Sequence, residues 1–290
     1  MTAEVPARAV PGMRGPDSVH TGTGYTDTEL AVAGRKRDGS RSSLVMEVLG
    51  EVIAARAAQS GRAALDIVDV GAGTGGFAVS LARGGHRVTV VDPSPDALAA
   101  ARWRAAEAGV TLTEVQGEAG DLPALVGEAT ADLVICHNVL EYVDSPSVAL
   151  AATARVLRPG GTLSVLAANT VAAVLQRALA GKYAEAQAML PGIAPAPASS
   201  DSAAEAPSGT APAGRRFTLP ELTALIEGAG LRVGDVHGIR IFASLLHSAF
   251  DQGAAVDPAT AAALRELEDA AATYPPLRDI ATRLHVLAYR

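Results

Sequence analysis

Hydrophobic positions along the chain follow two alternating patterns. Short β-branched runs, among them "LDIVDV" (65–70), "RVTVVD" (87–92) and "ADLVICHN" (131–138), predict buried strands. Alanine-rich stretches with apolar residues at helical spacing, such as "SPDALAAARWRAAEAG", lie between them. Strand and helix therefore alternate, which predicts an α/β fold with a parallel sheet covered by helices on both faces.

The regions outside this core have different patterns. Apolar residues recur at helical spacing from Leu44 to Ile53, which predicts a helix before the first strand, and the terminal "RLHVLAYR" predicts a last strand near the sheet edge. The start of the chain is interrupted by prolines, and the stretch "PGIAPAPASSDSAAEAPSGTAPAG" cannot bury enough apolar surface to offset its ordering entropy. We expect a disordered leader at 1–39, a core domain at 40–190, a flexible linker at 191–214 and a C-terminal completion of the sheet with helical additions at 215–290.

Composition and charge limit the class of protein to which the chain can belong. With 290 residues, 49% of them apolar, the chain can bury a substantial core. A formal net charge of −7 gives no global attraction to nucleic acid or to an anionic membrane. Cys136 is the single cysteine, so an internal disulfide and a thiolate metal cluster are excluded. The start has no apolar signal region, and the longest apolar stretch contains Asn169, Gln176 and Arg177, so we expect a cytoplasmic protein without membrane or metal association.

A glycine-rich turn, "DVGAGTGGF", follows the first predicted strand. Its glycines fit both GxGxxG, the spacing of dinucleotide sites, and GxGxG. Asp69 separates the two possibilities, because a carboxylate next to a pyrophosphate meets like charge, whereas beside the cationic amino end of S-adenosylmethionine it is favourable. Asp92 ends the second strand, where a carboxylate accepts ribose hydroxyls of either cofactor. The turn alone also fits a structural corner that binds nothing.

Motifs further along the chain add specificity. "ADLVICHNVLEYV" followed by "ATARVLRPGGTLSVL" resembles the fourth and fifth strand region of class I S-adenosylmethionine-dependent methyltransferases, and "DVGAGTGGF" resembles their first motif. The resemblance covers about residues 40 to 170. It implies S-adenosylmethionine as cofactor and a Rossmann-like, mostly parallel sheet of seven strands with an antiparallel last strand.

A closer resemblance lies partly outside that common core. "GSRSSLVMEVL", "VLEYVDSP", "NTVAAVLQRALAGKY", "VHGIRIF" and "LHVLAYR" are similar to the bacterial tRNA 5-carboxymethoxyuridine methyltransferases, which methylate a wobble-uridine carboxylate. The resemblance implies that Arg41 holds the methionine carboxylate, that Asp92 holds the ribose and that His137 closes the pocket. The expected cofactor-binding residues are Arg41, Asp69, Gly71, Ala72, Gly73, Asp92, Ala119, Gly120 and His137.

The sequence leaves three functions open. Methylation of a tRNA carboxylate needs a basic rim, for which Arg240, between two isoleucines, is the candidate acceptor-binding residue. Methylation of a small metabolite on oxygen or nitrogen needs an enclosed pocket and, for a neutral hydroxyl, a base such as His137 or Glu141. A non-catalytic cofactor-binding protein is the third. We expect no dedicated catalytic residue, because in-line transfer to an ionised carboxylate needs mainly positioning.

Overall fold

The computed structural model describes residues 27–190, 214–243, 245 and 257–290, and for residues 27–43 it describes the backbone alone. Contacts between residues divide the chain into two compact units, Met1–Asp38 and Gly39–Arg290. Helix α1 (Asp27–Ser60) begins within the stretch for which we expected a disordered leader. Residues 191–213 of the expected linker lie outside the described residues, so the proposed domain boundaries stay predictions.

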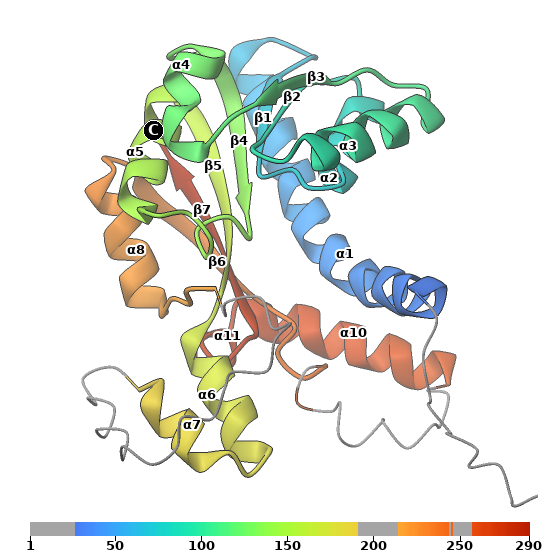
Figure 1. The fold of residues 1–290 in the computed structure, drawn as a ribbon, viewed down its shortest axis with the longest axis vertical. Helices are drawn as coiled ribbons and strands as arrows, with labels where there is room; N and C mark the ends of the chain where they lie inside the picture. The colour runs from blue at the N-terminus through green and yellow to red at the C-terminus, as the bar shows by residue number, and fades with distance from the viewer. Residues whose placement is uncertain (1–26, 191–213, 244, 246–256) are drawn as a thin grey trace, which may run out of the picture. The chain divides into compact units, whose positions relative to one another are not determined.

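One seven-stranded sheet organises the second unit, with strand order β3-β2-β1-β4-β5-β7-β6 (Figure 1). The strand β7 pairs antiparallel with both of its neighbours, and the pairs among β1 to β5 are parallel. This arrangement confirms the expected mostly parallel sheet with an antiparallel last strand. The strands are β1 (Asp66–Val70), β2 (Arg87–Asp92), β3 (Thr113–Gln116), β4 (Ala131–His137), β5 (Leu157–Ala168), β6 (Arg232–Ile239) and β7 (Arg283–Tyr289).

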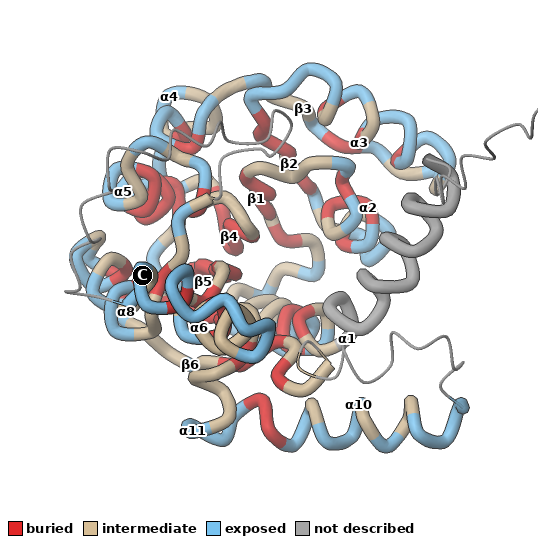
Figure 2. The backbone as a smooth tube through the Cα atoms, turned by 60° about the horizontal axis from the view of Figure 1, so that its bottom comes forward, coloured by how far each residue is buried: buried red, intermediate tan, exposed pale blue. Residues whose placement is uncertain are grey.

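Helices cover the two faces of the sheet with separate apolar cores. One core joins α1, α2 and α3 to the sheet, and the other joins α4, α5 and α8 to its opposite face. Figure 2 shows the buried strands between helices that are exposed along their outer sides. The bounds are α2 (Gly76–Arg83), α3 (Pro95–Glu107), a 3-10 turn η1 (Ala119–Asp121), α4 (Leu122–Val126), α5 (Pro146–Val156), α6 (Thr170–Leu179), α7 (Tyr183–Ala188), α8 (Leu219–Gly228), α10 (Pro258–Ala272) and α11 (Pro275–Arg278).

The ends of these helices follow local sequence rules. Ser94 and Ser145 cap α3 and α5 by accepting a backbone N–H, and a proline follows each of them at the first helical position. Thr218 and Glu221 form a reciprocal capping box at α8. Among the described helices, none is both long enough and apolar enough to cross a bilayer.

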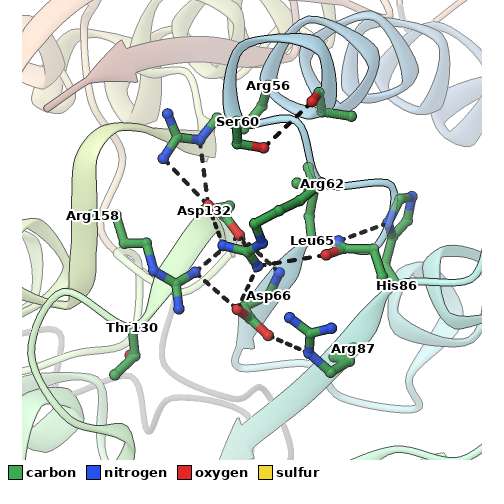
Figure 3. Close-up of polar contacts among 12 residues, drawn as sticks. Arg56, Ser60, Arg62, Leu65, Asp66, His86, Arg87, Thr130, Asp132 and Arg158 are labelled. Atoms are coloured by element: carbon green, nitrogen blue, oxygen red, sulfur yellow. Dashed lines mark hydrogen bonds and ion pairs between the residues drawn. The ribbon is translucent and has the colours of Figure 1, made fainter.

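At the amino edge of the sheet, a buried carboxylate is surrounded by arginines (Figure 3). The side chain of Asp132, at the start of β4, has no exposed surface and lies 2.9 Å from both Arg62 Nη2 and Arg158 Nη1, and 3.3 Å from Arg56 Nη2. Its Oδ2 also accepts the backbone N–H of Asp66 at 3.0 Å. The pair of carboxylate oxygens thereby connects α1, β1, β4 and β5.

We expect Asp132→Asn to lower the free energy of unfolding by about 3 kcal/mol, because it leaves three guanidinium groups around a neutral side chain. Urea unfolding at pH 7.5 measures this loss. Glu128→Gln is the control, since that carboxylate pairs with Arg155 on the surface and its loss should cost well under about 1 kcal/mol. Equal losses in the two variants would contradict the role assigned to Asp132.

Candidate functional site

The glycine-rich turn after β1 has a backbone that only glycine adopts without strain. Gly71, Gly73 and Gly75 have φ values of 62°, 52° and 72°. At Gly71 a Cβ atom would also lie 2.5 Å from Val139 Cγ2, and at Gly75 it would lie 2.8 Å from the Cβ of Ala101. The turn therefore packs directly against the segment that follows β4. Because the glycines carry no side chain, the backbone of the turn can come close to a bound ligand.

Asp92 fixes this turn to the end of β2. Its Oδ2 accepts the backbone N–H of Gly73 at 3.0 Å, and its Oδ1 accepts that of Ser94 at 2.9 Å. Gly71 donates its own N–H to the carbonyl of Val91 at 2.7 Å. One carboxylate thus links the glycine turn to the start of α3, and each of its oxygens keeps a further lone pair for a ligand.

A cleft of about 340 Å³ opens at the carboxyl ends of β1, β2 and β4. Its walls include Gly71, Asp92 and Ala119, together with Asn138, Val139 and Tyr142. Gly120 lines an adjoining hollow of about 360 Å³, which shares Ala119 and Tyr142 with the cleft. In an open α/β sheet, ligands bind at this edge, where the strand order reverses between β1 and β4.

The cleft brings together three of the residues expected from the sequence: Gly71, Asp92 and Ala119. Ala72 and Gly73 belong to the glycine turn but do not line the cleft, and the side chain of Arg41 lies outside the described residues. The binding roles expected for these residues stay predictions.

Asp69, in β1 two residues before Gly71, is 4% exposed. Burial, followed by the charge of Asp92, raises the pKa of Asp69 to about 7, although a hydrogen bond from the backbone of Ala78 lowers it in part. Ionising this carboxyl group therefore costs free energy in the absence of a cation. An ammonium group placed beside it would recover that cost.

His137 and Arg240 differ from their expected surroundings. His137 does not line the cleft; the centroid of its ring lies 5.0 Å from that of Phe77, and its Nε2 lies 2.8 Å from Ser164 Oγ. Arg240 lines a separate cavity of about 30 Å³ with Glu268, and its carbonyl accepts bonds from Thr282. The described contacts therefore do not place Arg240 at the cleft.

Arg283, Asn138 and Glu141 form a polar group at this edge that we did not predict from the sequence. The Nη1 of Arg283, at the start of β7, contacts Asn138 and lies 3.3 Å from Glu141 Oε1, which also accepts the N–H of Ala168 at 2.8 Å. Burial raises the pKa of Glu141, and bonds from the backbone together with the charges of Arg283 and Arg216 offset part of that rise. Glu141 Oε2 is buried and has no hydrogen-bond partner among the described residues.

The polar group was missed because its members are distant in sequence. Arg283 and Asn138 are separated by 145 positions, and nothing in "RLHVLAYR" distinguishes the arginine from a surface residue. Asn138 gave a weak signal, since it directly follows a buried strand, and its left-handed φ of 58° marks the tight turn there. Among the described residues, no group of three or more His, Cys, Asp or Glu side chains is arranged to hold a metal ion.

Comparisons with known proteins agree with this geometry. A family model described as a methyltransferase domain matches residues 68–165. The tRNA 5-carboxymethoxyuridine methyltransferase of Escherichia coli (strain K12) is 30% identical over 162 residues, which span 55% of this chain and 60% of that protein. The ubiquinone biosynthesis O-methyltransferase of Xanthomonas campestris pv. campestris (strain B100) is 31% identical over 174 residues, which span 57% of this chain and 71% of that protein.

A solved structure of a methyltransferase has a similar fold. An S-adenosylmethionine-dependent methyltransferase from Methanosarcina mazei superposes with a TM-score of 0.52 over 79% of this chain and 93% of that one. The two sequences are 16% identical, so this likeness concerns the fold.

The buried Asp69 predicts a pH-dependent stability. Its folded pKa of about 7 lies above the ordinary value of 3.8, so its favourable contribution is present at low pH and is lost as the pH rises through 7. In the unliganded protein, Asp69→Asn should therefore gain stability relative to wild type between pH 5 and pH 8, by on the order of 2 kcal/mol.

Unfolding in urea at the two pH values measures this difference. Asp66→Asn, on the same strand, is the control: the pKa of Asp66 is lowered to about 2, because bonds from Arg87, Arg158 and Arg62 outweigh the effect of burial. Asp66 is thus ionised at both pH values, and its variant should show a constant difference from wild type. A constant difference for Asp69→Asn as well would show that Asp69 does not titrate in this range.

Proposed function

Because the chain belongs to the class I S-adenosylmethionine-dependent methyltransferases, we propose that it transfers a methyl group from that cofactor to an anionic acceptor at the carboxyl edge of its sheet. The observation that carries the proposal is the adjacency of two sites at this edge. The cleft of Gly71, Asp92 and Ala119 shares Asn138 with the contact made by Arg283.

The chain's residues fit the proposed cofactor. The turn at Gly71 offers backbone without a side chain, Asp92 offers two carboxylate oxygens for ribose hydroxyls, and Ala119 and Val139 offer small apolar surface for a flat base. Asp69 offers a carboxylate whose ionisation a nearby ammonium would favour. We retain Arg41 as the proposed partner of the methionine carboxylate, and Gly73, Ala72 and Gly120 as backbone neighbours of the site.

The glycine turn and Asp92 would hold S-adenosylmethionine, which would supply a methyl group on a positively charged sulfur. Transfer to an ionised carboxylate would form the carbon–oxygen bond as the carbon–sulfur bond breaks, with neutral S-adenosylhomocysteine as the leaving group. The protein then needs to hold the acceptor, exclude water and align the two groups, which can lower the barrier by several kcal/mol. The guanidinium of Arg283 is suited to hold a carboxylate because its planar donors can make paired charge-assisted hydrogen bonds. No base is needed for such an acceptor.

A carboxylate on a modified tRNA uridine is the acceptor that we propose first. Two further arginines lie next to the edge: Arg215 donates its backbone N–H to the carbonyl of Glu141 at 2.9 Å, and Arg216 is close enough to lower the pKa of the Glu141 carboxyl group. With Arg283 they would form the local basic rim that the acidic chain as a whole does not provide. The tRNA methyltransferase relative supports the same choice, and a cytoplasmic location follows from it as part of the proposal.

Methylation of a hydroxyl on a small metabolite is the alternative, and Glu141 is the observation that favours it. This carboxyl group has a raised pKa and a buried Oε2 without a described partner, two properties of a general base. The O-methyltransferase relative supports this reading. Arg283 would then orient Glu141 and not the acceptor.

Loss of the Asp92 carboxylate should abolish most cofactor binding. We expect Asp92→Ala to weaken S-adenosylmethionine binding by roughly 100-fold, because it removes two charge-assisted hydrogen bonds and releases Gly73. Isothermal titration calorimetry measures the affinity. Asp96→Ala is the control, since Asp96 is exposed in the first turn of α3 and should leave the affinity within about twofold of wild type. Unchanged affinity of Asp92→Ala would remove Asp92 from the site.

The acceptor class is tested with labelled cofactor and two substrate pools. Total tRNA from a strain lacking this gene should take up the labelled methyl group, and Arg283→Met should raise the KM for that tRNA roughly tenfold or more while leaving cofactor affinity unchanged. Arg87→Met, which removes an equal charge at the opposite edge of the sheet, is the matched control. Label that enters only the small-molecule extract would reject the tRNA proposal and favour the hydroxyl acceptor.

A further inference from the structure

The segment 279–282 leads into β7 and therefore sets where Arg283 begins. Arg283 is the first residue of β7; its guanidinium contacts Asn138 and lies 3.3 Å from Glu141 Oε1. The position of the backbone before Arg283 limits where this guanidinium can reach. The contacts that hold segment 279–282 thus bear directly on the polar group at the carboxyl edge of the sheet.

Asn169 binds this segment from the end of β5. It directly follows that strand and is 2% exposed. Its Nδ2 donates to the carbonyls of Asp279 and Ala281, both at 2.8 Å, and its backbone N–H donates to the carbonyl of Thr282 at 3.1 Å. One buried residue therefore holds three of the four carbonyls that precede Arg283.

The amide of Asn169 uses its full hydrogen-bonding capacity on two tasks. Its Oδ1 accepts the N–H of Val171 at 3.0 Å, which caps α6, while both hydrogens of Nδ2 are donated to segment 279–282. A serine or threonine at this position could still cap the helix, but a hydroxyl has one hydrogen and cannot bind both carbonyls. The two tasks are therefore separable by substitution.

The same end of β5 also holds the partner of Arg283. Ala168, the residue before Asn169, donates its N–H to Glu141 Oε1 at 2.8 Å, and this is the oxygen that Arg283 approaches. The carboxylate is thus held through Ala168 and the arginine through Asn169. Two consecutive residues fix both members of one ion pair.

We propose that Asn169 is a positioning residue, which holds the backbone before Arg283 so that the guanidinium lies where the acceptor carboxylate binds. The inference rests on the proposed function, in which Arg283 holds the acceptor. Asn169 does not line the cleft, so it acts through segment 279–282. Thr282 donates its Oγ1 to the carbonyl of Arg240 at 2.8 Å, so the segment keeps a second anchor when the Asn169 amide is removed.

Asn169→Ser tests the proposal, because it retains a helix cap and removes both amide donors. Carbon-13 NMR of protein labelled at the glutamate carboxyl carbons follows Glu141, whose signal Glu141→Gln identifies. Burial raises the pKa of Glu141, and bonds from the backbone together with the charges of Arg283 and Arg216 lower it in part. If the guanidinium of Arg283 moves away, this pKa should rise, as it should in Arg283→Met.

A double variant shows whether the effect passes through Arg283. In the Arg283→Met protein, adding Asn169→Ser should leave the pKa of Glu141 where Arg283→Met alone places it, because the charge that Asn169 positions is already gone. A further rise would show that Asn169 acts on Glu141 by another route, and it would overturn the proposal.

Kinetics give the second readout. Asn169→Ser should raise the KM for tRNA roughly fivefold or more and leave the affinity for S-adenosylmethionine unchanged, since a small displacement of a binding group costs much of its effect. Thr153→Ala is the control for loss of a buried polar group: Thr153 donates to Ala149 O at 2.9 Å within α5, and its variant should lose stability alone. Should Asn169→Ser not fold, Asn169→Thr makes the same test, because the backbone here is extended and suits a β-branched residue.

The outcomes separate this inference from the proposed function. An unchanged pKa of Glu141 in the folded Asn169 variant would overturn the positioning role, whatever the kinetics show. A raised pKa with an unchanged KM for tRNA would confirm that Asn169 positions Arg283 and would refute the acceptor-binding role of Arg283 in the proposed function.

Discussion

The close approach of the glycine turn to the segment after β4 is the constraint on which the site depends. At Gly71 there is no room for a side chain, since a Cβ atom would lie 2.5 Å from Val139. Asp92 secures the same turn through Gly73, and it also binds Ser94 at the start of α3. Val139 and Asp92 therefore fix the backbone that forms the cleft. Because this backbone is already ordered, less conformational entropy is lost when a ligand binds.

The sequence predicted the parts of this site that are local. The strand, turn and helix around Gly71 follow from short-range patterns, as does the position of Asp92 at the end of β2, because parallel strands bring their carboxyl ends to one edge. The seven-stranded sheet with its antiparallel last strand followed from the family resemblance. These features depend on few residues close together in the chain.

The parts that the sequence did not reveal depend on long-range pairing. Arg283 reaches Asn138 because β7 runs antiparallel beside β5. His137, His285 and His237 lie side by side because the registers of β4, β5, β7 and β6 align these positions. A shift of one residue in any of these registers would turn the histidines to the other face. Arg240 shows the converse: its isoleucine neighbours suggested an inward-facing anion ligand, but it lines a separate small cavity with Glu268.

A crystal structure of the protein with bound S-adenosylhomocysteine would show whether the cleft holds the cofactor. We expect the ribose hydroxyls to bind the carboxylate of Asp92, the base to lie beside Ala119 and Val139, and the amino end of the ligand to face Asp69. A ligand bound elsewhere, or one whose ribose faces away from Asp92, would contradict the assignment of this cleft as the cofactor site.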